Sequence, residues 1–76
     1  MKLIDIIEAI NTSFAIHVIK KDGKFGDSAS VSYKGACTNC IAECAKAREI
    51  AKRDNLVLDM ITTNNDGMIL IAVKEV

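Results

Sequence analysis

Two hairpin-turn signals flank one helical segment, and this arrangement restricts the fold more than any other feature of the chain. Asp22-Gly23 follows the β-forming stretch 14–21, and the residues from Asn64 to Gly67 separate the stretches 56–63 and 68–76. Turn dipeptides that end in glycine, placed between β-forming stretches, are typical of β-hairpins. The sequence therefore predicts one hairpin before the helical segment and one after it.

Periodicity assigns the remaining segments. Residues 28–33 alternate strictly, with Ala29, Val31 and Tyr33 on one side and serines on the other, which predicts a half-buried return strand. Residues 37–54 are rich in alanine and charge and place Glu49 four residues before Arg53, as in a helix. In residues 2–11, leucine and isoleucine recur at the spacing of one helix face.

The chain has 76 residues, which is enough for a single domain with one core and predicts one domain over residues 1–76. The predicted class is α+β, in the order α-β-β-α-β-β. Two hairpins around one helix most simply form a four-stranded antiparallel sheet, because an isolated strand pair is only marginally stable. The long helix would pack on this sheet, and the N-terminal helix would be short.

The last predicted strand is apolar on both faces. Met68, Leu70 and Ala72 alternate with Ile69, Ile71 and Val73. One helix covers only one face of a sheet, so the other face needs the first helix, a second copy of the chain or a foreign partner. A homodimer is therefore expected, while the face that the long helix covers stays undecided at this stage.

All three cysteines lie in the pattern C-x2-C-x3-C at the start of the long helix. Cys37, Cys40 and Cys44 fall on the helix stripe that also contains Ala47 and Ala51, and free cysteine behaves as a small buried hydrophobe. The main interpretation is therefore packing, with no bound metal. The alternatives are a zinc or iron–sulfur site that His17 or an outside ligand would complete, and a dithiol redox site at Cys37 and Cys40.

Charge and motifs exclude several functional classes. Ten basic and ten acidic residues cancel, so no overall field attracts nucleic acid, and nucleic-acid binding is not expected. Asp5 and Glu8 interrupt the apolar N-terminus well before the roughly 15–20 residues of a signal core or membrane span. The expectation is a cytoplasmic protein without membrane contact, catalytic machinery or cofactor, because the sequence contains no catalytic or phosphate-binding motif.

Partner contacts are expected mainly at the first hairpin. A lone histidine in a strand is usually a packed or interface side chain, and lysines gather near the turn. On the long helix, an isoleucine among charged residues on the polar side could anchor a partner. The candidate contact residues are His17, Ile19, Lys20, Lys21, Lys24 and Ile50.

Residues 14–76 resemble several small phage-encoded anti-CRISPR proteins. The shared features are a β-hairpin, the alanine-rich helix "CIAECAKAREIAKRDN" and a second hairpin, "VLDMITTNNDGMILIAVKEV". The resemblance is one of layout, without a diagnostic motif, so no residue role is transferred. It implies a rigid, non-catalytic inhibitor that occupies a surface of a host defence complex, in the host cytoplasm if the chain is phage-encoded. The alternative from another class is a homo-oligomer that binds a small ligand or metal at its cysteine face.

Overall fold

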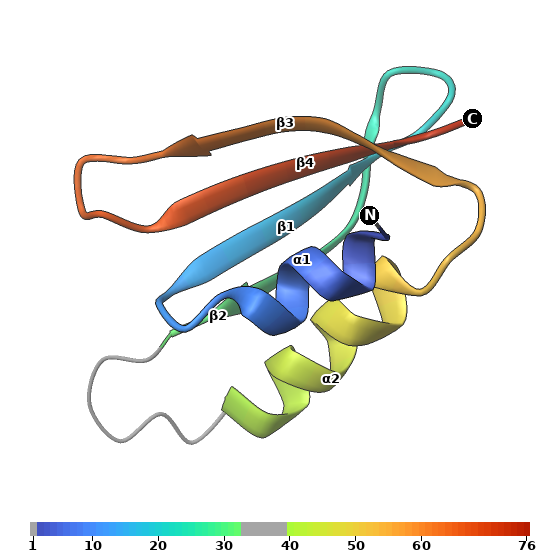
Figure 1. Cartoon of the computed structure of the whole chain (residues 1–76). Coiled ribbons are helices and arrows are strands. Elements are labelled where there is room, and N and C mark those ends of the chain that lie inside the picture. The colour runs from blue at the N-terminus through green and yellow to red at the C-terminus, as the bar shows by residue number, and fades with distance from the viewer. Residues whose placement is uncertain (1, 33–39) are drawn as a thin grey trace.

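The structure is a computed structural model that describes residues 2–32 and 40–76 (Figure 1). The described residues form α1 (Leu3–Ala9), β1 (Phe14–Ile19), β2 (Phe25–Val31), α2 (Cys40–Ala51), β3 (Leu56–Thr63) and β4 (Ile69–Glu75). The predicted α+β class and element order are confirmed. Tyr33, Cys37 and the side chain of Cys40 lie outside the described part of the structure, so the predictions for them are untested.

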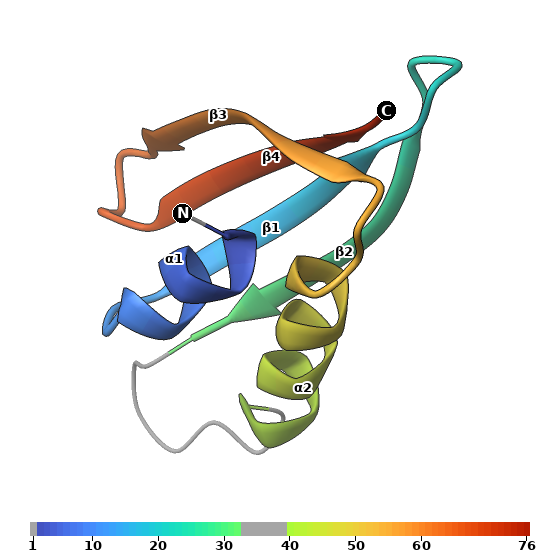
Figure 2. The same ribbon diagram turned by 45° about the vertical axis from the view of Figure 1, so that its right-hand side comes forward.

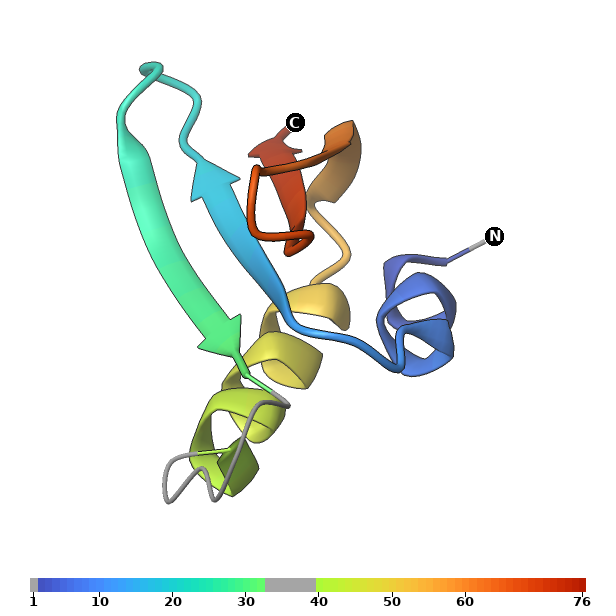
Figure 3. The ribbon, with the colours of Figure 1, turned by 90° about the vertical axis from the view of Figure 1, so that its left-hand side faces the viewer.

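The four strands form one sheet in the order β2-β1-β4-β3 (Figure 3). The two hairpins are antiparallel as predicted, but the central strands β1 and β4 are parallel, so the prediction of a purely antiparallel sheet was wrong. The reason is the single helix between the hairpins. Parallel strands need a long crossover connection, and α2 returns the chain so that β3 starts in the same direction as β2.

Both hairpins turn through a three-residue loop that ends in a left-handed glycine. In the first, the Lys20 amide donates to the Lys24 carbonyl at 2.8 Å, and the Gly23 amide donates to the Lys20 carbonyl at 2.8 Å. Asn64, Gly67 and Met68 repeat this pattern in the second. The φ angles of Gly23 and Gly67 are 85° and 80°, a region that side-chain-bearing residues rarely adopt.

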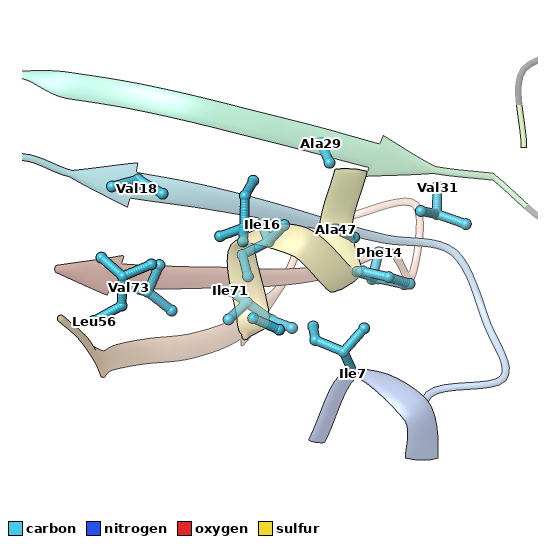
Figure 4. Packing of buried hydrophobic residues seen from close by; sticks show 12 residues of the cluster. Ile7, Phe14, Ile16, Val18, Ala29, Val31, Ala47, Leu56, Ile71 and Val73 are labelled. Atoms are coloured by element: carbon cyan, nitrogen blue, oxygen red, sulfur yellow. The ribbon is translucent and has the colours of Figure 1, made fainter. Parts of the chain in front are cut away.

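Both helices pack on the same face of the sheet and contact each other (Figures 1 and 2). Side chains from that face of the strands meet side chains of the helices in one apolar cluster (Figure 4). Its buried members are Ile7, Phe14, Ile16, Val18, Ala29, Val31, Ala47, Ile50, Ala51, Leu56, Ile71 and Val73. Among the described residues, no helix covers the opposite face of the sheet.

The core-facing stripe of α2 contains the buried Ala47 and Ala51 and the half-buried Cys44, as predicted, but it also contains Ile50. Ile50 is 0% exposed, so its prediction as a partner contact was wrong. A core-facing helix stripe is at least about 100° wide, and position 50 lies within it beside positions 47 and 51. Ile41, near the start of the same helix, is 87% exposed.

Polar contacts fix α2 along the outer edge of β2. The Glu43 carboxylate accepts the Ser30 amide at 2.9 Å, and the Arg53 guanidinium pairs with Asp27 at 2.7 Å and with Glu49 at 2.8 Å. The Arg53–Glu49 pair confirms the predicted i,i+4 spacing. The helix therefore covers the β2 edge with charged side chains.

The Arg53 contact predicts a pH effect. The hydrogen bond from Arg53, together with its charge, lowers the pKa of the Asp27 carboxyl below its ordinary value of 3.8. Since the folded-state pKa is the lower one, the contact stabilises the fold above the unfolded pKa, and this contribution is lost as pH falls through the folded pKa. Carboxyl NMR titration should place the Asp27 midpoint below 3.8. In Arg53→Gln the midpoint should rise, and an unchanged midpoint would contradict the assignment.

Candidate functional site

The open face is the sheet surface opposite the helices, and it contains an apolar groove of about 290 Å³. All four strands contribute to it. Its lining consists of His17, Ile19, Phe25, Asp59, Met60, Thr62, Leu70 and Ala72, with the buried Ile71 beneath. The groove brings together residues from the first and last hairpins that are far apart in the sequence.

A β-bulge in β2 places Phe25 on the open face. His17 is opposite Ser28, while Ile19 is opposite Phe25, so β2 has one extra residue between these two pairs. Without that residue, alternation from Ala29 would direct Phe25 toward the core. Phe25 is instead 78% exposed. Sequence reasoning missed this residue, although a glycine inside a strand, here Gly26, often marks a bulge.

A second bulge, in β3, places two neighbouring residues on the open face. Leu58 is opposite Val73 and Met60 is opposite Ala72, so Asp59 is the extra residue. Asp59 and Met60 both line the groove. The Asp59 carboxylate lies 3.7 Å from the Lys74 ammonium at the border of the groove. The Asp59 side chain is exposed to solvent.

The structure brings only part of the predicted contact set together. His17 and Ile19 lie in the groove. Lys20, Lys21 and Lys24 are exposed around the first turn, where the Lys24 amide donates to the Asp22 carboxylate at 2.9 Å. The turn is therefore a mixed-charge tip at one end of the open face.

The alternative metal set is divided between the two sides of the sheet. His17 lies on the open face, whereas Cys44 lies on the helix side beside Ile7 and Phe14, in a small cleft that Arg48 also lines. A single ion in one chain therefore does not contact both side chains. Among the side chains of residues 2–32 and 41–76, no group of three or more histidine, cysteine or acidic residues is placed to hold a metal.

Two further findings concern membranes and relatives. In the described part of the chain, neither helix is long and apolar enough to span a bilayer. No protein-family model, curated protein or solved structure matches the chain.

Proposed function

We propose that the chain is a non-catalytic protein-binding module and that its open face contacts the partner. The observation on which this depends is the apolar groove across all four strands. Its side chains include Phe25 and Met60, which are 78% and 53% exposed. Large apolar side chains gathered on one face of a small domain favour association with another protein.

The groove suits a protein surface better than a small ligand. Small-molecule sites usually enclose about 300–1,000 Å³ and bury most of the ligand, whereas this groove, at about 290 Å³, is at the lower end of that range and is open to solvent along the sheet. Aromatic and methionine side chains are also enriched in protein interfaces. His17 and Asp59 add two polar groups that could orient a partner by hydrogen bonds.

We further propose that the partner is a host defence complex and that the chain is an inhibitor encoded by a phage or mobile element. The basis is the anti-CRISPR-like layout of two hairpins around one helix. Such an inhibitor would act in the host cytoplasm by occupying a surface, which requires no chemistry from its own side chains. We also propose that the chain forms a homodimer, which inhibition by surface occupation does not itself require.

Plaque assays test this proposal in bacteria that carry a defined CRISPR–Cas system and express the chain. Wild-type protein should restore plaque formation by a targeted phage. Leu70→Asp places a charge in the middle of the groove, and removal of a central interface contact typically weakens binding by about thirtyfold or more. The variant should therefore lose most of the plaque restoration at equal expression.

Ile41→Asp is the matched control, because Ile41 is exposed on α2, on the other side of the sheet from the groove. It should be as active as wild type. Loss of activity in Ile41→Asp, with full activity in Leu70→Asp, would move the contact surface to the helix side. If the wild-type protein does not restore plaque formation with any of the CRISPR–Cas systems tested, the inhibitor proposal is rejected.

A further inference from the structure

The outer edge of β3 is an apolar strand edge at the end of the sheet (Figure 3). It differs from the β2 edge, where Glu43 accepts the Ser30 amide and Arg53 holds Asp27. Among the described residues, no strand lies beyond β3. Leu58 and Ile61 are 41% and 49% exposed on the helix side of this strand. An exposed, apolar edge of this kind is a template for pairing with another strand.

The hydrogen bonds at the two ends of the β3–β4 hairpin determine which backbone groups point outward. The Asn64 amide donates to Met68, and the Val76 amide donates to Asn55, each at 3.0 Å. Antiparallel pairs alternate between bonded and non-bonded types, and the bulge at Asp59 shifts the alternation by one residue. The outward-facing backbone groups are therefore those of Leu56, Leu58, Ile61 and Thr63.

This outward pattern reads the same in both directions. The steps along the strand are two, three and two residues, centred between Asp59 and Met60. A second β3, rotated by a two-fold axis through that centre, therefore presents an outward group opposite every outward group of the first. Leu56 faces the partner's Thr63, and Leu58 faces the partner's Ile61. The Leu58–Ile61 pair is apolar, and the two-fold axis generates it twice.

The bulge also determines what meets at the axis. In a regular strand every second residue faces outward, so the outward residues are all odd-numbered or all even-numbered. A two-fold axis that pairs two such edges therefore passes through a residue and places it opposite its own copy. The bulge moves the axis between two residues. Asp59 is then directly opposite the partner's Met60 rather than another Asp59, and Lys74, 3.7 Å away, offsets its charge.

We propose that two copies of this chain pair through antiparallel β3 edges in this register. The edge is eight residues long, a strip of roughly 27 by 10 Å, or about 270 Å² in projection. Stable interfaces bury about 800 Å² per partner, so pairing through this strip alone gives a weak dimer that dissociates on dilution. The self-complementary register is the reason for choosing a second copy over a foreign strand.

The pairing continues the sheet across the two-fold axis. Both helix layers then lie on one side, and the two open faces join on the other, with Met60 and Thr62 next to the axis. The dimer would present two grooves in one surface. This consequence rests on the proposed function of the open face, whereas the pairing itself does not depend on it.

Amide hydrogen exchange of the wild-type protein at about 5 μM and about 500 μM tests the pairing, since a weak interface forms only at the higher concentration. Mass spectrometry with residue-level fragmentation would measure the exchange of each amide. At the higher concentration, protection should increase for the amides of Leu56, Leu58, Ile61 and Thr63. The amides of Val57, Met60 and Thr62, which face β4, should be protected at both. An isotope-filtered NOE between α-protons of Val57 and the partner's Thr62 would fix the register, because these residues form a close non-bonded pair.

Ile61→Lys places a charge on the edge and should leave a monomer at both concentrations in sedimentation experiments. Ile41→Lys introduces the same charge on exposed α2 and should dimerise like wild type. Melting curves check that both variants are folded. If Ile61→Lys is unfolded, the exchange pattern of the wild-type protein still shows whether the β3 edges pair.

A wild-type monomer at the higher concentration would overturn the proposal and would identify the bulge and Asp59 as devices that prevent edge pairing. New protection confined to β2 would also overturn it. Neither result depends on phage protection. If the chain dimerises but does not restore plaques, the pairing is supported and the inhibitor proposal is rejected. If the chain is monomeric but restores plaques, the pairing is rejected and the inhibitor proposal is supported.

Discussion

Replacing Ile50 by alanine is expected to lower the free energy of unfolding by about 2–5 kcal/mol, the usual cost of removing a large aliphatic side chain from a core. Ile50 is 0% exposed and packs in the cluster between α2 and the sheet. A domain of 76 residues typically has only about 4–11 kcal/mol of total stability. One core substitution therefore removes a large part of it.

Urea denaturation of Ile50→Ala and Ile41→Ala measures this difference on one helix with the same chemical change. Ile41 is 87% exposed, so its replacement should change the free energy of unfolding by no more than about 0.5 kcal/mol. Equal losses in the two variants would mean that the buried face of α2 has been assigned incorrectly.

The contrast between these two isoleucines shows which residues helix periodicity can assign to the core and which it cannot. The sequence correctly predicted that Ala47 and Ala51 face the core, because they repeat at four-residue spacing. It placed Ile50 on the polar side, because the neighbouring positions on the helix surface, Glu43, Lys46 and Arg53, are charged. An apolar residue at the border of a stripe faces whichever side has space, and that depends on the sheet below.

The hairpins were predictable and the bulges were not. Asp22-Gly23 and Asn64 to Gly67 each form the expected turn, since their backbone preferences are local. The bulges depend on how a strand meets its neighbour, so alternation alone misplaces Phe25 and does not foresee that Asp59 and Met60 share a face. Most of the groove residues could therefore not be predicted from the sequence, although His17 and Ile19 were predicted as contact residues.

The strand order shows a similar limit. Each hairpin is determined by nearby residues, but whether the two meet through parallel or antiparallel strands depends on the path of α2. The sequence of β4 gave no preference for a covered face, because both sets of alternating residues are apolar. The structure assigns Ile71 and Val73 to the core and Leu70 and Ala72 to the open face.

Aspartate substitutions at adjacent positions of β4 test this assignment of faces. Ile71→Asp buries an unpaired carboxylate in the core, where Ile71 is 1% exposed, and should cost about 4 kcal/mol or more. That loss approaches the whole stability of a domain of this size, so the variant should be largely unfolded. Far-UV circular dichroism and the dispersion of amide NMR signals at neutral pH would show it.

Leu70→Asp changes the next residue along the strand but places its carboxylate on the open face, where water can solvate it. Leu70 is half-buried, so the lost apolar contact should cost only about 1–2 kcal/mol, and the protein should stay folded. The opposite ranking would mean that the helices cover the other face of the sheet. The expected ranking would also show that Leu70→Asp keeps the fold, which is the condition under which a loss of activity in this variant reports on partner binding.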